Sequence, residues 1–163
     1  MSKLPRQRII QIIVLGIAAA LIFVDQLAKS IVIATQQPYV SKPLIGDLVK
    51  IYLTYNDSAA FSIGFGITWV FTVLSAIAAL ALIWYSRKII SGSWAVLFGL
   101  ALGGVVGNLI DRLTRAPGFG IGKVVDFIQV PFNFAIFNLA DSAIVVVAII
   151  TVIRVLRGDK IGK

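Results

Sequence analysis

The acidic residues of this sequence have the clearest capacity for chemistry. All seven are Asp and none is Glu, and several lie at the ends of long apolar segments or just inside them. An ionisable side chain at bilayer depth costs about 2.5 to 3.5 kcal/mol or more, so such a carboxylate is by default a functional candidate. Asp126 and Asp141 are the leading pair. His and Cys are absent, which removes the usual general base and any thiol nucleophile.

Asp126 and Asp141 can meet because little chain separates them. Asn138 and Asp141 share one face at the start of a predicted helix, and Asp126 lies among apolar residues shortly before it. Two close carboxylates cannot both ionise readily, so the pair shares a proton. Such a dyad can activate water and protonate a leaving amide nitrogen without a metal ion or another cofactor. Spacing alone leaves an alternative open, in which Asp126 caps a turn and Asp141 contacts a helix N-terminus.

Helical spacing places other polar residues together. Asp25 and Lys29 are four residues apart in the acid-first order, which predicts a buried ion pair that orients the first helix. Asn108, Asp111 and Arg112 share a face of the third helix. For these three, a structural network and substrate contact both remain open, since Arg can bind carbonyl or phosphate oxygens. On the same helix, a stripe of small residues predicts close helix packing: Gly99, Gly103 and Gly107.

Composition places these residues in an integral membrane protein. Hydrophobic residues make up 59% of the 163 residues and charged residues only 13%, against about a quarter charged in soluble proteins. Four stretches are long enough to cross a bilayer core about 30 Å thick, at about 9–34, 68–85, 94–113 and 135–156. The alternation from Leu44 to Tyr55 predicts a strand within a β-rich outer segment at about 38–66. We therefore expect an all-α membrane protein with a single domain, 1–163. It is a four-transmembrane-helix bundle with a small extracytoplasmic β-sheet and a surface loop.

The basic residues predict the orientation of this bundle. In a four-span topology nine of them fall on the side of the termini and five on the other side. The positive-inside rule then puts both termini in the cytoplasm and the Asp-rich face outside. The net charge of +8 is thereby explained by topology, and nucleic acid is not an expected partner. A site on the Asp-rich face opens near the outer leaflet.

Five motifs in this order resemble those of lipoprotein signal peptidase, the signal peptidase II family of bacterial membrane aspartic proteases. They are VDQLAKS at 24–30, YNDSAAFS at 55–62, GGVVGNLIDRL at 103–113, VVDFI at 124–128 and FNLADSAI at 137–144. The resemblance covers nearly the whole chain. It implies a multi-pass protein of the bacterial cytoplasmic (inner) membrane that removes signal peptides from diacylglyceryl-modified prolipoproteins, cutting before the lipidated cysteine. The implied partners are the lipid-modified prolipoprotein, membrane lipids and the inhibitor globomycin.

The resemblance also assigns functions to individual residues. The family's catalytic aspartates correspond to Asp126 and Asp141, with no metal and no cofactor. A substrate-binding or dyad-supporting polar set corresponds to Asn56, Asn108, Arg112 and Asn138. Structural polar residues correspond to Asp25, Lys29 and Asp111, and Ala60 and Ala140 also fall in motifs. One departure is Ser58, which stands where the family usually has Gly; if that Gly has a positive φ, Ser58 strains the loop.

Two functions from other classes compete with this interpretation. A small ion-coupled transporter could use buried aspartates to carry protons or cations. Its hallmarks would be charges near mid-span and repeated halves, whereas the acids here crowd one membrane face. An assembly factor could bind lipidated clients without cutting them, and would then tolerate Asp126→Asn and Asp141→Asn.

Overall fold

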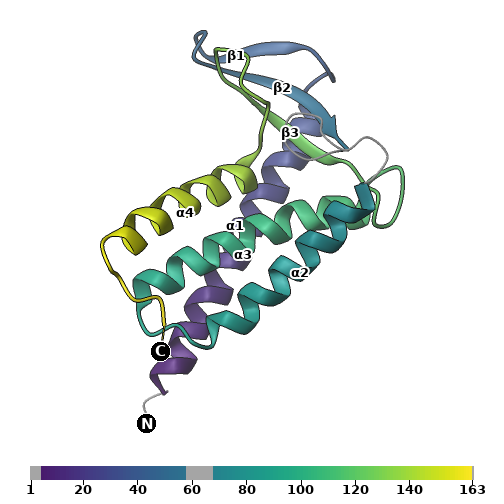
Figure 1. Cartoon of the computed structure of the whole chain (residues 1–163). Helices are drawn as coiled ribbons and strands as arrows, with labels where there is room; N and C mark the ends of the chain where they lie inside the picture. Colours follow the sequence, from purple (N-terminus) through teal and green to yellow (C-terminus); the bar gives the residue numbers. More distant parts are fainter. Residues whose placement is uncertain (1–4, 58–67, 163) are drawn as a thin grey trace, which may run out of the picture.

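The computed structural model describes residues 5–57 and 68–162. Four long helices form its body: α1 (Arg6–Thr35), α2 (Thr68–Ser86), α3 (Gly92–Thr114) and α4 (Leu139–Leu156). Each is long and apolar enough to cross a membrane. Figure 1 shows the two termini at one end of the helical body and the strands at the other. The predicted four-helix fold with a small sheet is confirmed, and the protein is a multi-pass membrane protein. Lys3, Ser58, Ala60 and Lys163 lie outside the described residues.

Helix α3 lies at the centre of the bundle and packs against the other three helices. Its glycines allow this, because a Cβ atom at Gly99 or Gly103 would lie within 3.0 Å of α1 atoms. A Cβ at Gly104 would lie 2.7 Å from the carbonyl oxygen of Ala140 in α4. The small residues thus bring the helix backbones close together, as expected where helices pack within lipid.

The sheet has three antiparallel strands in the order β1 (Ser41–Ile45), β2 (Val49–Asn56) and β3 (Val124–Gln129). The single strand predicted from Leu44 to Tyr55 is wrong in this respect: a turn containing Gly46 at φ +51° divides the segment into two strands. Leu53, Val125 and Phe127 are buried beneath the sheet against Val32 of α1. This small core fixes β3 over the C-terminal end of α1.

The connection from β3 to α4 decides where the last helix begins. The N–H groups of Phe127 and Ile128 donate to the carbonyl oxygen of Phe137, at 3.0 and 2.8 Å. Phe137 is therefore extended beside β3, and Asn138 caps the helix that follows. Helix α4 starts at Leu139, whereas the hydrophobic pattern of the sequence predicts that the last span starts at about residue 135. The same pairing brings Asn138 next to the strand that carries Asp126.

Candidate active site

Asp126 lies in β3 with its carboxyl group between two amide donors. Its residue is 1% exposed, and it pairs across the sheet with Thr54 of β2. Asn56 Nδ2 donates to Asp126 Oδ2 at 2.9 Å, and Asn138 Nδ2 donates to Asp126 Oδ1 at 2.6 Å. Asp126 therefore belongs to a strand. The alternative in which Asp126 caps a turn, which the residue spacing left open, is wrong.

Asp141 lies in the first turn of α4 and contacts the same asparagine. The N–H of Asn138 donates to Asp141 Oδ2 at 3.1 Å, while the N–H of Asp141 donates to Asn138 Oδ1 at 2.9 Å. This reciprocal arrangement is a capping box. Asn108 Nδ2 donates to the other oxygen, Asp141 Oδ1, at 2.7 Å. Asp141 thus has the predicted helix N-terminal contact and also faces the polar site.

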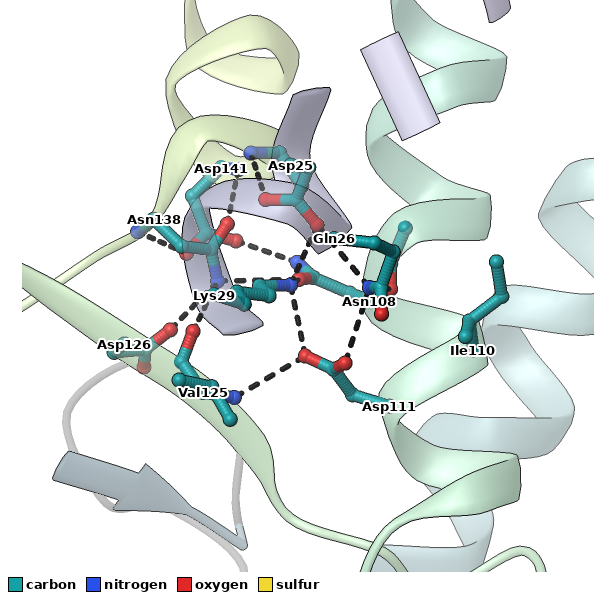
Figure 2. A network of polar contacts seen from close by, with 12 residues as sticks. Asp25, Gln26, Lys29, Asn108, Ile110, Asp111, Val125, Asp126, Asn138 and Asp141 are labelled. Atoms are coloured by element: carbon teal, nitrogen blue, oxygen red, sulfur yellow. Dashed lines mark hydrogen bonds and ion pairs between the residues drawn. The ribbon is translucent and has the colours of Figure 1, made fainter. Parts of the chain in front are cut away.

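Asn138 joins the two aspartates. It is 0% exposed, and its hydrogen bonds reach Asp126 with the side chain and Asp141 with both backbone and side chain. Figure 2 shows these carboxyl groups on either side of Asn138, one from β3 and one from α4. Burial, together with the charge of Asp141, raises the pKa of Asp126 to about 7, although the hydrogen bonds from Asn56 and Asn138 lower it. The carboxyl group of Asp126 therefore still binds a proton in a large fraction of molecules near neutral pH.

A buried ion network lies directly behind this pair. Lys29 Nζ contacts Asp25 Oδ2 at 2.8 Å and Asp111 Oδ2 at 2.8 Å, and donates to Asn108 Oδ1 at 3.0 Å. Lys29, Asp25 and Asp111 are all 0% exposed. The predicted Asp25–Lys29 ion pair is therefore present, and Asp111 shares its cation. The network joins α1 to α3 and, through Asn108, to Asp141 (Figure 2).

Two members of this network were missed in the sequence. Arg115 Nε lies 2.6 Å from Asp111 Oδ1, and Gln26 Nε2 donates to the same oxygen at 3.1 Å. Arg115 could have been found, because it follows Asp111 by four residues in the same acid-first order as Asp25 and Lys29. Gln26 carries no such signal, since it is adjacent to Asp25 and its two shorter hydrogen bonds, to Gly107 and Asp111, reach another helix.

Arg112 lies near the C-terminal end of α3 and is 6% exposed. Its guanidinium carbon is 5.5 Å from the centre of the Phe71 ring, which is within the range of a cation–π interaction. Its charge also interacts favourably with Asp126, Asp111 and Asp141. The sequence-predicted polar residues therefore gather at one end of the bundle, with Arg112 on the α2 side.

A cavity of about 350 Å³ opens next to the two aspartates. Its polar lining consists of Asn56, Asp126 and Asp141, and the rest is apolar, including Phe137 and Ile144. Within residues 5–57 and 68–162, the acidic side chains form no group of three that could hold a metal ion. The geometry offers two carboxyl groups, amide donors and an apolar wall, which suits acid–base chemistry on a largely apolar substrate.

Comparison with known proteins shows the family to which the chain belongs. A family model described as Signal peptidase (SPase) II matches residues 17–157. The lipoprotein signal peptidase of Leifsonia xyli subsp. xyli is 43% identical over 148 residues, which cover 90% of this chain and 68% of that protein. The lipoprotein signal peptidase of Mycobacterium avium is 38% identical over 154 residues, covering 93% of this chain and 84% of that protein.

The fold has a matching counterpart among solved structures. A bacterial membrane enzyme determined by the in meso method superposes with a TM-score of 0.79 at 30% sequence identity. The match covers 88% of this chain and 87% of the solved one. Because the family model spans most of the chain and the relatives agree with it in sequence and fold, the chain belongs to the signal peptidase II family of membrane proteases.

Proposed function

We propose that this protein is an aspartic endopeptidase that removes the signal peptide from diacylglyceryl-modified prolipoproteins by cutting before the lipidated cysteine. Membership of the signal peptidase II family supports the removal of signal peptides from prolipoproteins. The observation that carries the aspartate mechanism is Asn138, which is hydrogen-bonded to Asp126 and to Asp141 beside one cavity. Asp126 and Asp141 are thus the proposed catalytic residues.

In this mechanism the dyad begins with one shared proton. Asp126 holds it, in line with its raised pKa of about 7, while Asp141 is ionised at the positive end of α4. Asp141 takes a proton from water as the water oxygen attacks the scissile carbonyl carbon, and Asp126 hydrogen-bonds the carbonyl oxygen. Asp141 then passes this proton to the amide nitrogen, the C–N bond breaks, and a carboxylic acid and an amine leave, with Asp126 still protonated and Asp141 ionised again.

The lining of the cavity supports a route for the substrate. Ile144 and Val145 of α4 line it together with Phe134 and Phe137, and Val145 is 56% exposed on the outside of the bundle. The acyl chains remain in the lipid along α4 while the scissile peptide enters between the helices and the sheet. Asn56, Asn108, Asn138 and Arg112 bind the peptide or support the dyad.

Orientation follows from charge and from the position of the sheet. The termini lie in the cytoplasm, the protein crosses the inner membrane four times, and the dyad works near the outer leaflet. The basic residues at the end of the termini, among them Arg87, Lys88, Arg154 and Arg157, support this arrangement.

Cleavage of a diacylglyceryl-modified prolipoprotein by the purified protein in detergent tests the proposal. The parent is expected to cut before the lipidated cysteine, and folded Asp126→Asn and Asp141→Asn variants are expected to lose cleavage by 100-fold or more, the order of an acid–base contribution. Binding without cutting by the parent would instead identify an assembly factor. Undiminished cutting by either variant would remove that aspartate from the mechanism.

The cyclic peptide globomycin provides a second probe of the same cavity, because the family resemblance implies that it is an inhibitor. It is expected to compete with the lipidated substrate, raising KM and leaving kcat unchanged. Val145→Trp, which fills the apolar wall of the cavity, is expected to weaken globomycin inhibition and substrate cleavage together. Inhibition that changes kcat alone would contradict binding at the dyad.

A further inference from the structure

The proposed mechanism does not use Lys29, although it is a fully buried cation next to the dyad. Its side chain is 0% exposed and has three partners on two helices: Asp25 on α1, and Asn108 and Asp111 on α3. A lysine ammonium has three N–H donors and no acceptor. The three contacts at 2.8 to 3.0 Å therefore use its whole hydrogen-bonding capacity.

The absence of an acceptor on Lys29 fixes which way the Asn108 amide faces. The carbonyl oxygen of Asn108 must face the ammonium, and it also accepts a hydrogen bond from Asn138 Nδ2 at 3.1 Å. The amide nitrogen then faces the opposite way, where it donates to Asp141 Oδ1 at 2.7 Å. A reversed amide would place its N–H groups against the ammonium and its oxygen against the Asp141 carboxylate, which are two unfavourable contacts.

We propose that Lys29 is a positioning residue of the dyad, which acts through Asn108 by holding its amide so that Nδ2 donates to Asp141. This inference rests on the proposed function. Lys29 touches neither aspartate of the dyad. Its charge lowers the pKa of Asp126, and its contact with Asn108 orients Asp141, so we expect its loss to affect proton transfer and not substrate binding.

The two carboxylate partners of Lys29 support the same function. Asp25 Oδ1 accepts the N–H of Ala140, the residue before Asp141, at 3.1 Å. Asp111 Oδ2 accepts the N–H of Val125, the residue before Asp126, at 3.2 Å. Each ion pair of Lys29 thus extends to the backbone that carries one member of the dyad (Figure 2).

A double-mutant cycle tests whether Lys29 acts through Asn108. All proteins in the cycle carry Asp25→Asn. In this background, removal of Lys29 leaves one acidic residue, Asp111, paired with one basic residue, Arg115, so the buried network stays neutral. The Asn side chain also keeps an oxygen that can accept the N–H of Ala140. Lys29→Met and Asn108→Ala are added singly and together. Each single change is expected to lower kcat by about 10- to 100-fold, the usual cost of losing a partner that orients a reactive group, with KM within about threefold.

The combination of both changes decides the question. If Lys29 works through Asn108, the combined variant has the kcat of the more impaired single variant. Multiplied losses would show that the two residues act independently and would overturn the inference. An unchanged kcat in the folded Lys29→Met protein would do the same.

Two further variants separate positioning from loss of stability. Lys29→Gln has the same reach as Lys29→Met but keeps an N–H donor, so it is expected to recover at least fivefold in kcat; equal values for Met and Gln would contradict the inference. Arg115→Met removes a partner of Asp111 and leaves the Lys29–Asn108 contact intact. It is expected to lower the unfolding temperature while retaining kcat. Cleavage by the parent protein is measured first. An inactive parent would refute the proposed function. An active parent with an unaffected Lys29 variant would refute only this inference.

Discussion

Asp126 makes the stability of the protein depend on pH. Its pKa is raised to about 7 in the folded protein and is about 3.9 in an unfolded chain, so the folded state binds more protons between these values. The stability from this group is complete below about pH 4 and is lost as pH rises to 7. A shift of about 3 units corresponds to about 4 kcal/mol. Asp126→Asn cannot ionise, so we expect its unfolding temperature relative to the parent to be higher at pH 8 than at pH 4. Equal differences at both pH values, measured in detergent, would contradict this.

Asn56 should set the upper pH limit of activity. Because its amide donates to Asp126 Oδ2 and lowers the pKa of that carboxyl group, Asn56→Ala raises the pKa further. The dyad needs its single proton, so activity falls as Asp126 ionises, and the parent is expected to have a bell-shaped profile. In Asn56→Ala the alkaline limb of kcat/KM should move to higher pH. A limb that stays in place would show that Asp126 does not control it.

For individual residues, the sequence predicts the chemistry of the site but not its complete set of contacts. Asp126 and Asp141 stand out because carboxylates among apolar residues are costly, and Asn138 because it shares a helix face with Asp141. The Lys29–Asp111 contact joins two helices, and no spacing within one segment predicts it. The contribution of Ser58 stays a prediction, because that residue lies outside the described chain.

The N-cap residue of helix α4, Asn138, has two separable functions. Asn138 Oδ1 caps the helix by accepting the N–H of Asp141, and Nδ2 donates to Asp126. Asn138→Ser keeps a capping oxygen and loses the amide donor, whereas Asn138→Ala loses both. Both variants are expected to lose most of their activity, and only Ala should lose a further ~1 kcal/mol of stability for the missing cap. Equal stability of the two variants in thermal unfolding would show that the cap contributes nothing.

The packing of α3 depends on glycines at two close approaches. A Cβ at Gly107 would lie 2.9 Å from Asp25 Oδ2, and one at Gly104 2.7 Å from the backbone oxygen of Ala140. Ala at either position should cost about 1 to 3 kcal/mol, as for overpacked cores, and Gly107→Ala should also impair cleavage by displacing Asp25. Gly16→Ala is the matched control, because no atom lies within 4 Å of its Cβ position. A similar loss in the control would contradict the packing explanation.

Elements with a strong local signal could be predicted, and those that depend on distant pairing could not. The four helices follow from long apolar runs. Strand β3 joins the sheet by pairing with β2 and by the burial of Leu53, Val125 and Phe127 against α1, which are contacts between segments far apart in the sequence. The start of α4 was misplaced for the same reason, since residues 135–137 are apolar and Phe137 pairs with β3.

The two ends of the molecule are built differently. At the end with the termini, Arg6 donates to the carbonyl oxygen of Ile90 at 2.8 Å, and the Arg154 guanidinium carbon lies 4.1 Å from the centre of the Trp94 ring. These contacts tie α1 and α4 to the start of α3. The other end carries the sheet (Figure 1), and it includes Asp126 of β3 and Asp141 in the first turn of α4. The basic residues of the first end and the proposed catalytic aspartates of the second are thus separated by the full length of the helices.

This separation predicts opposite exposure of the two ends across the membrane, and the absence of native Cys allows a clean labelling test. Leu48 at the β1–β2 turn is 68% exposed and Phe132 in the β3–α4 connection is 101% exposed, whereas Lys160 lies in the exposed C-terminal tail. In spheroplasts, whose inner membrane is intact, a membrane-impermeant maleimide should label Leu48→Cys and Phe132→Cys. Lys160→Cys should react only after the membrane is opened. The reverse pattern would invert the topology and place the dyad on the cytoplasmic side. There it could not meet a prolipoprotein whose lipidated cysteine lies at the outer leaflet.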